Sequence, residues 1–401
     1  MRVAEGRPSE AAATLQGLLM AVAVLHVCDK FGVAGSSIHG VSRLFSWWFP
    51  RYDPSRFEVG LVGLKKEEPA SRRLAEQGIP VHHLGRGRFD PRILTDLIGL
   101  ARERRVRLLH VHGYAAADFG RLAARAVGAA LVLHEHFADP RMPAYQGLAD
   151  RALSHLTHRA IAVSRSTRDF LVNERHVPAE KVRLIWNGAP LDEFAPVSRE
   201  RALAVRRELG LGDDSPVVGS IGRLNTQKGH AFLLEAAPAV LAAHPAVRFL
   251  VVGDGDLMAS LQAQAHGLGL GDRVRFAGHR ADVPDLLGAI DVLAIPSLYE
   301  GTPLALFEAM AAGKAIVATA VDGCAEILED GATARLVPPR DPKALATVLV
   351  SLLSDPAERG RLATAARAAS RRYDIATCVA QMQDLYDEAL ALASRRSGRA
   401  A

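Results

Sequence analysis

Short runs of hydrophobic residues alternate with longer stretches in which hydrophobic residues recur every three or four positions, from Leu18 to about Leu353. The short runs are typical of buried β-strands and the longer stretches of amphipathic helices. In the first half, the predicted strands cover residues 20–27, 58–62, 81–84, 108–111, 130–135, 160–163 and 183–185. Strands that alternate with helices in this way predict α/β layers built on parallel sheets.

The length of the chain bounds the number of domains. At 401 residues it is too long for one typical core and fits two domains of about 190 residues each. We place the boundary near Pro196, at the end of the predicted strands of the first half. This gives domains of residues 1–195 and 196–372, a last helix over 373–394 and a disordered tail over 395–401.

The start of the chain is interpreted as a poorly ordered leader before the first strand and not as a signal peptide. Charged residues precede the hydrophobic run at 18–27, and a polar Cys-Asp-Lys follows it instead of a small-residue cleavage site. No hydrophobic run approaches the roughly 20 residues that a membrane-spanning helix needs.

Charge and cysteine content bear on partners and location. Residues 1–195 carry 27 Lys and Arg against 20 Asp and Glu, whereas the rest carries 22 against 24. A basic first half suits an anionic acceptor or the anionic leaflet of a membrane; an arginine-rich overall composition is the open alternative. Cys28, Cys324 and Cys378 lie far apart and suggest no disulfide framework. We therefore expect a cytoplasmic protein, with peripheral contact to the inner face of the membrane left open.

The segment 295–313 predicts a strand end, a turn and a helix that is apolar nearly all round and therefore buried. Thr302 suits the N-cap of this helix, Pro303 its first position, and Gly313 the residue just past its end. Two carboxylates interrupt the segment, Glu300 in the turn and Glu308 in the helix.

Glu308 has no Lys or Arg within four residues in the sequence. A buried carboxylate is costly unless it is paired or hydrogen-bonded. Because an ionised carboxylate only accepts hydrogen bonds, a pair of vicinal hydroxyls, such as a ribose carries, is a suitable partner. A buried helix with one salt-bridged glutamate is the alternative.

The block EGTPLALFEAMAAGKAIVAT, from Glu300 to Thr319, resembles the retaining nucleotide-sugar glycosyltransferases of the GT-B fold, family 4. The resemblance covers the chain from about Leu25 to Leu390. It implies two Rossmann-like domains that face each other across a cleft, with the acceptor on residues 1–195 and the nucleotide sugar on 196–372. It also implies that the helix over 373–394 crosses back onto the first domain, and that the sugar is transferred with retention of configuration.

The second domain opens with a predicted strand, a turn that carries Arg223 and Lys228, and a helix that starts near Gly229. Two cations at a helix N-terminus favour an anion there. The resemblance implies that Arg223 and Lys228 hold the diphosphate and stabilise the leaving group. A solvated basic turn is the alternative.

The resemblance assigns further roles by position. It implies that Glu300 holds sugar hydroxyls, that Glu308 holds the ribose, and that His136 contacts the donor sugar, with His134 as the alternative. Catalytic roles fall to Arg223, Lys228, Glu300 and His136. The implied donor site comprises Gly35, Gly222, Arg223, Lys228, Gly253, His279, Arg280, Glu300, Gly301, Thr302, Leu304 and Glu308.

No metal and no cofactor are expected. Asp254-x-Asp256 has a spacing that binds metal in another glycosyltransferase fold, but here it leads from a strand into a helix, as in this family. His110, His112, His134 and His136 stand at two strand ends without a supporting Cys or carboxylate set. The expected partners are a UDP- or GDP-sugar donor and a saccharide or lipid-linked acceptor, and not nucleic acid.

Three alternatives stay open. Trp47 and Trp48, beside Arg43 and Arg51, form either a membrane foot or acceptor wall or, as we favour, part of the core. The chain is either a transferase, in our interpretation for cell-surface polysaccharide, lipopolysaccharide or glycolipid assembly, or a nucleotide-sugar epimerase of the same fold. A third possibility for the function of the chain is a non-catalytic partner subunit that binds nucleotide.

Overall fold

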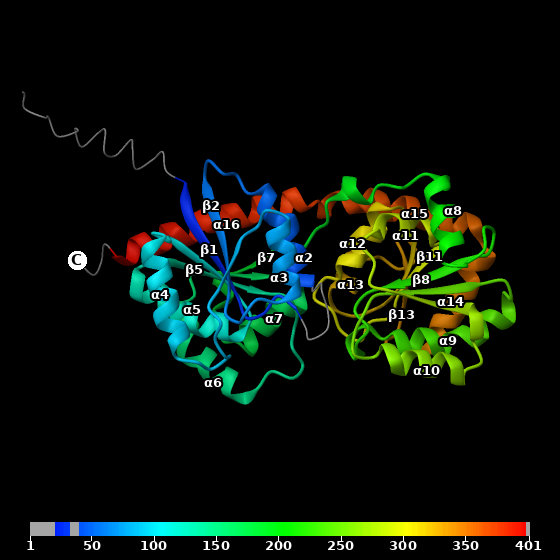
Figure 1. Ribbon diagram of the computed structural model, residues 1–401, viewed down its shortest axis with the longest axis horizontal. Coiled ribbons are helices and arrows are strands. Elements are labelled where there is room, and N and C mark those ends of the chain that lie inside the picture. The colour runs from blue at the N-terminus through cyan, green and yellow to red at the C-terminus, as the bar shows by residue number, and fades with distance from the viewer. Residues whose placement is uncertain (1–20, 33–39, 398–401) are drawn as a thin grey trace, which may run out of the picture.

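The computed structural model describes residues 21–32 and 40–397, so the predicted leader and Gly35 lie outside the described residues. Figure 1 shows two lobes side by side, each built on one parallel sheet. The first sheet has the order β3-β2-β1-β4-β5-β6-β7. Its strands are β1 (Val22–Cys28), β2 (Phe57–Gly63), β3 (Val81–His83), β4 (Leu108–His112), β5 (Ala130–Glu135), β6 (Arg159–Ala162) and β7 (Val182–Leu184).

The second sheet has the order β10-β9-β8-β11-β12-β13. Its strands are β8 (Val217–Ile221), β9 (Arg248–Val252), β10 (Val274–Gly278), β11 (Val292–Ile295), β12 (Ala315–Thr319) and β13 (Arg335–Val337). The prediction of two parallel-sheet domains is confirmed. All seven strands predicted in the first half are present, with ends that differ by one or two residues. The boundary near Pro196 falls between β7 and β8 and stays a prediction.

Helices connect the strands and cover both faces of each sheet (Figure 1). In the first lobe they are α2 (Gly40–Trp48), α3 (Pro69–Glu76), α4 (Arg92–Glu103), α5 (Tyr114–Val127), α6 (Ala144–Leu153) and α7 (Arg165–Asn173). In the second they are α8 (Arg199–Glu208), α9 (His230–Ala243), α10 (Met258–Gly267), α11 (Val283–Ala289), α12 (Leu304–Ala311), α13 (Asp322–Ile327), α14 (Pro342–Ser354) and α15 (Pro356–Ser370). Because both faces are covered, β4 and β5 are buried at every position.

The last helix, α16 (Ile375–Ser397), leaves the second lobe and runs along the first (Figure 1). Its Tyr386 is fully buried and bonds to Tyr52, and its Glu388 pairs with Arg159 at 2.8 Å. The predicted crossing helix is therefore confirmed. Its predicted end was wrong, because regular helix continues through Ser397 into the segment expected to be a disordered tail.

One hydrophobic cluster extends through both lobes along α2, α12 and α16. Phe45 and Trp48 of α2 are fully buried in it, and Trp47 is only 6% exposed. The tryptophans are therefore core residues, as favoured, and the alternative of a membrane foot is wrong. Among the described helices, none is long and apolar enough to cross a membrane.

A buried ionic network lies under the cleft side of the first sheet. Arg175, after α7, donates to Asp150 of α6 at 2.8 Å and to Glu135 of β5 at 2.5 Å. Arg121 of α5 donates to the same Asp150. The guanidinium of Arg175 has no exposed surface. Removing one partner from such a network leaves buried charges without compensation.

We therefore expect Arg175→Ala to lower the free energy of unfolding by about 3–5 kcal/mol. Arg168→Ala, in the same region but on an exposed side chain, should change it by less than about 0.5 kcal/mol. Urea denaturation followed by circular dichroism measures both. Equal effects of the two substitutions would contradict the structural role of Arg175.

Candidate functional site

A cleft of about 950 Å³ lies between the two lobes. The ends of β1, β4 and β5 line it from the first lobe, and the ends of β8 and β9 with the turn after β11 line it from the second. These are carboxyl ends of parallel strands, where open α/β sheets bind their ligands. A volume of this size fits a ligand larger than a simple metabolite.

Glu300 lies in the turn that follows β11 and is 4% exposed. Its carboxylate accepts from Ser297 Oγ at 2.7 Å and from Lys228 Nζ at 2.5 Å. Its backbone N–H donates to Asp322 at 2.8 Å. Two of the predicted catalytic residues, Lys228 and Glu300, thus form an ion pair with each other, which the prediction of separate roles did not include.

The predicted start of α12 was wrong by one residue. Pro303 has an extended backbone (ψ 125°), so the helix begins at Leu304. Thr302 does not cap it, because its hydroxyl accepts from Asn187 Nδ2 of the first lobe at 2.7 Å. Gly313, with φ +62°, follows the end of the helix as predicted.

Glu308 is fully buried in α12. Arg43 Nη1 of α2 lies 2.9 Å from its Oε1, so the carboxylate does have a cationic neighbour, 265 positions away in sequence. The contact is close but not aligned as a hydrogen bond, since neither carboxylate oxygen has a hydrogen-bond partner among the described residues. Burial raises the pKa of Glu308, and the charges of Arg43 and Lys228 oppose that rise.

The two predicted phosphate-binding cations lie on one wall of the cleft. Arg223 follows β8; burial lowers its pKa, and no ion pair of its side chain occurs within the described ranges. Lys228 ends a short 3₁₀ turn just before α9, which starts at His230 as expected. Both cations are partly buried, and their binding of a diphosphate stays a prediction.

Two predicted glycines are required by close contacts. A Cβ at Gly301 would lie 1.9 Å from the carbonyl oxygen of His136, across the cleft. A Cβ at Gly253, which has φ +138°, would lie 1.9 Å from the carbonyl oxygen of Gly222. Position 301 therefore needs glycine for the two lobes to meet at the site, and position 253 for two strand ends to meet.

His136 follows β5 and lines the cleft, whereas its alternative His134 is fully buried behind it. The Nε2 atom of His136 is 3.0 Å from His112 Nδ1, and its Nδ1 has no partner among the described residues. His136 is thus the histidine of this pair that borders the cleft, although this Nδ1 atom is itself buried. Its contact with a sugar stays a prediction.

The remaining predicted positions lie at the edges of the cleft. Leu304 lines it at the start of α12. His279 Nε2 is 3.2 Å from Arg73 Nη1 of the first lobe. The guanidinium of Arg280 is held by Glu208 and Asp282 of its own lobe and does not offer a free charge. Asp254 accepts from the backbone of Gly255 at 2.7 Å and shapes the turn after β9.

Sequence reasoning missed three contributors. Arg43 reaches Glu308, Asn187 reaches Thr302, and Asp322 fixes the backbone of Glu300. Asn187 stands in an Asn-Gly pair that is typical of a turn, yet it is 4% exposed and bridges the lobes. The signal available in the sequence was the lack of any local cation beside Glu308, which implied a distant partner.

Comparison with known proteins is consistent with this geometry. Residues 215–355 match the model of glycosyl transferases group 1, and residues 50–193 match Glycosyltransferase Family 4. A D-inositol 3-phosphate glycosyltransferase of Xylanimonas cellulosilytica is 32% identical over 70% of this chain and 72% of that protein. The UDP-Gal:alpha-D-GlcNAc-diphosphoundecaprenol alpha-1,3-galactosyltransferase of Escherichia coli is 31% identical over 58% of this chain and 63% of that protein.

A solved structure extends the comparison to the fold. Anabaena HepE in complex with UDP superposes with a TM-score of 0.78 at 25% identity, covering 90% of this chain and 99% of that one. Two Rossmann-like domains that face a common cleft are the GT-B architecture. The chain belongs to glycosyltransferase family 4, and the resemblance found in its sequence is confirmed.

Acid sensitivity follows from the histidines behind the site. Burial lowers the pKa of His26 to about 3 and that of His136 to about 4. An unfolded histidine titrates near about 6.5, so below that pH the unfolded state takes up protons that the folded state does not. The resulting stability is complete above about pH 6.5 and is lost as the pH falls towards the folded values.

We expect the free energy of unfolding to fall between pH 6.5 and 5. His26→Gln should reduce this slope by up to about 1.4 kcal/mol per pH unit. His155→Gln, at an exposed histidine, should leave the slope unchanged. Urea denaturation at several pH values measures it, and an unchanged slope in His26→Gln would contradict a neutral, buried His26.

Proposed function

We propose that the protein transfers a sugar from a UDP-sugar to an acceptor hydroxyl with retention of the anomeric configuration. The observation that carries the proposal is the single wall formed by Arg223, Lys228, Glu300 and Glu308, with His136 facing it from the other lobe. Cations at a helix N-terminus suit a diphosphate. A buried carboxylate without hydrogen bonds suits the two hydroxyls of a ribose.

The Lys228–Glu300 pair suggests how the site is kept in order. Each group neutralises the other at 2.5 Å. When the diphosphate enters, Lys228 exchanges Glu300 for a phosphate oxygen, and Glu300 becomes free to accept from hydroxyls of the sugar. Both residues are then used in the roles that the family resemblance implies.

In the reaction, the bond from C1 of the sugar to the phosphate oxygen breaks and a bond from C1 to the acceptor oxygen forms on the same face. Arg223, Lys228 and the N-terminal amides of α9 stabilise the charge that develops on the leaving phosphate. That phosphate takes the proton of the acceptor hydroxyl. No side chain is assigned as a dedicated general base, and with two cations on the diphosphate no metal ion is assigned.

The choice of uridine rests on relatives. HepE, at 25% identity, is a complex with UDP and also with UDP-glucose, and the named substrate of the E. coli relative is a UDP-sugar. The identity of the sugar is not part of the proposal. GDP remains the other outcome of the binding experiment.

The first-lobe wall suits an anionic acceptor. Lys30, Lys65 and Arg88 line it, and no ion pair of these three side chains occurs in the described part of the chain. We assign a phosphate-bearing saccharide or lipid-linked acceptor of cell-surface polysaccharide, lipopolysaccharide or glycolipid assembly, at the cytoplasmic side of a membrane.

A small apolar surface adjoins this wall. Arg88 lies over the rings of Phe89 and Tyr145, which contact each other at 5.5 Å between centroids. Phe89 is 68% exposed and Leu148 is 72% exposed. Exposed apolar side chains beside cations are typical of a surface that lies on anionic lipid.

Nucleotide binding tests the donor site. In the presence of EDTA, UDP should raise the Tm of the wild type, since ligand at about 100 times its Kd adds about 2.7 kcal/mol of stability. Glu308→Ala should weaken UDP binding by at least tenfold, about 1.4 kcal/mol, through loss of the ribose hydrogen bonds. Glu329→Ala, at an exposed carboxylate of the same lobe, is the control and should bind like the wild type.

The outcomes separate the alternatives. Stabilisation by GDP alone would correct the base, and stabilisation that needs added magnesium would overturn the metal-free assignment. Conversion of a UDP-sugar without acceptor would identify an epimerase. Nucleotide binding without turnover on any acceptor would favour a non-catalytic subunit, and a product of inverted configuration would refute retention.

Membrane contact is tested with vesicles. The protein should co-sediment with vesicles of anionic phospholipid at physiological salt, and Phe89→Ser/Leu148→Ser should reduce binding several-fold. Leu268→Ser, at an exposed leucine of the second lobe, should not. Absence of binding by the wild type would remove the membrane part of the proposal.

A further inference from the structure

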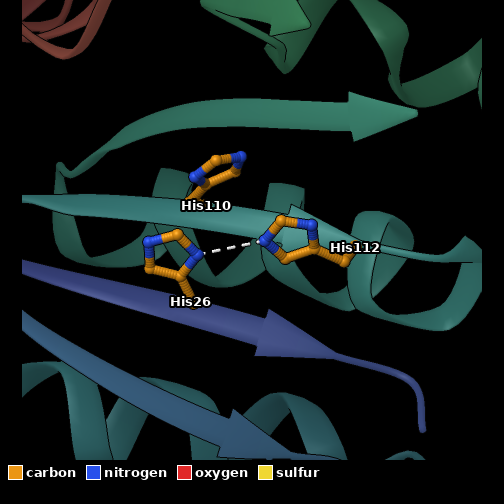
Figure 2. Close-up of side chains that lie close together, drawn as sticks. All are labelled: His26, His110 and His112. Carbon is orange, nitrogen blue, oxygen red and sulfur yellow. Dashed lines mark hydrogen bonds between the residues drawn. The ribbon is translucent and has the colours of Figure 1, made fainter. Parts of the chain in front are cut away.

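Behind the cleft, five histidines gather on one face of the first sheet. They are His26 of β1, His110 and His112 of β4, and His134 and His136 at the end of β5. The two pairs are two residues apart, so strand alternation places their side chains on the same face. Parallel register brings His26 beside His110 and His112 beside His134. Figure 2 shows His26, His110 and His112 on neighbouring strands, with their rings close together.

The rings form two hydrogen-bonded arms. In the first arm, His136 Nε2 lies 3.0 Å from His112 Nδ1, and His112 Nε2 lies 3.1 Å from His26 Nδ1 (Figure 2). His26 Nε2 lies 3.2 Å from both Tyr52 and Tyr386 hydroxyls. This arm runs from the cleft to the buried helix α16.

The second arm starts at the same tyrosine. The Tyr386 hydroxyl lies 2.6 Å from His110 Nδ1, and His110 Nε2 lies 3.1 Å from His134 Nδ1. The hydroxyls of Tyr386 and Tyr52 are 2.8 Å apart. All ring nitrogens of the three histidines in Figure 2 are therefore used in hydrogen bonds, whereas His134 Nε2 and His136 Nδ1 are buried without a partner among the described residues.

The number of protons limits how the arms can be arranged. Burial lowers the pKa of each of the five histidines well below neutrality, so each ring carries one N–H. An inner histidine that donates through one nitrogen must accept through the other. The bonds of the first arm therefore all point the same way, either from His136 inwards or from the tyrosines outwards.

Distances at the junction select the direction. A separation of 2.6 Å is typical of an O–H donor and shorter than the roughly 2.7–3.2 Å of N–H donors, so Tyr386 donates to His110. Its single proton is then used, and Tyr52 must donate to Tyr386. His26 Nε2, at 3.2 Å from both oxygens, is left as the donor to the tyrosines.

We propose that Tyr386 of α16 fixes the tautomer of His136 in the cleft, through His26 and His112. Because His26 donates to the tyrosines, His112 donates to His26 and His136 donates to His112 through Nε2. The Nδ1 atom of His136, which is buried and has no partner among the described residues, is then unprotonated and can only accept a hydrogen bond. If the proposed function holds, a hydroxyl of the donor sugar supplies that bond, and Tyr386 is a positioning residue for it.

The test compares substitutions of Tyr386 and Tyr52, whose hydroxyls meet where the two arms join. In Tyr386→Phe, the hydroxyl of Tyr52 loses its acceptor and turns to His26 Nε2. This reverses the first arm and places the proton of His136 on Nδ1. In Tyr52→Phe, Tyr386 still donates to His110 and still accepts from His26, so His136 keeps its tautomer. Each variant removes one buried hydroxyl, which matches their cost to stability.

The primary readout is the tautomer of His136, from long-range ¹H–¹⁵N correlation spectra of protein labelled at histidine and treated with EDTA, with His136→Gln to assign the signal. We expect Nε2–H in the wild type and in Tyr52→Phe, and Nδ1–H in Tyr386→Phe. Nδ1–H in the wild type would overturn the proposal, and this measurement needs neither tyrosine variant to fold. An unchanged tautomer in folded Tyr386→Phe would overturn the coupling.

Kinetics give a second readout that depends on the proposed function. Tyr386→Phe should lower kcat by about tenfold, the effect of one misdirected hydrogen bond of about 1.4 kcal/mol. Its affinity for UDP should be unchanged, because UDP does not carry the sugar that is transferred and that His136 is proposed to contact. Tyr52→Phe should stay within about twofold of the wild type. A tautomer switch without a kinetic change would preserve the relay and refute only its role in transfer.

Discussion

The contact between Arg43 and Glu308 is the interaction on which the cleft depends. A fully buried carboxylate would cost several kcal/mol without compensation, and the compensating cation comes from the opposite lobe. The Arg43–Glu308 contact therefore joins the two lobes across the cleft. The compensation is incomplete, because both carboxylate oxygens still lack hydrogen bonds. A ligand with two hydrogen-bond donors in this position can form the hydrogen bonds to Glu308 that the protein itself does not supply.

The same arrangement recurs at Lys228 and Glu300, where two groups with separate tasks hold each other until a ligand separates them. Both pairs place each carboxylate beside a cation at the wall of the cleft. Such preorganisation is the main way in which a site of this kind stabilises developing charge. It also explains why these positions combine burial with strong polarity inside an otherwise apolar segment.

Most of the fold followed from sequence pattern, whereas part of the site did not. Buried strands such as β5 are continuous hydrophobic runs, and their ends could be placed within two residues. The Glu300–Thr319 block identified the donor wall because its chemistry is local. Arg43, Asn187 and Tyr386 were missed as partners because each acts on a residue more than 100 positions away, and a hydrophobic pattern carries no information on such pairing. Thr302 was misassigned as a cap for the same reason, since its partner is Asn187.

The hydrogen bonds of Tyr386 give the crossing helix α16 a second function besides packing. A helix that only fastened the two lobes would need apolar residues on its buried face, and Met382 and Leu385 supply them. A buried tyrosine with three polar neighbours adds a requirement on direction, because one hydroxyl proton has to be shared among them. The direction of the hydrogen bond at Tyr386 therefore determines the direction of each hydrogen bond between the histidines, as far as His136 at the cleft. The last described helix is thus coupled to the imidazole of His136, a residue whose backbone carbonyl lies against Gly301 of the second lobe.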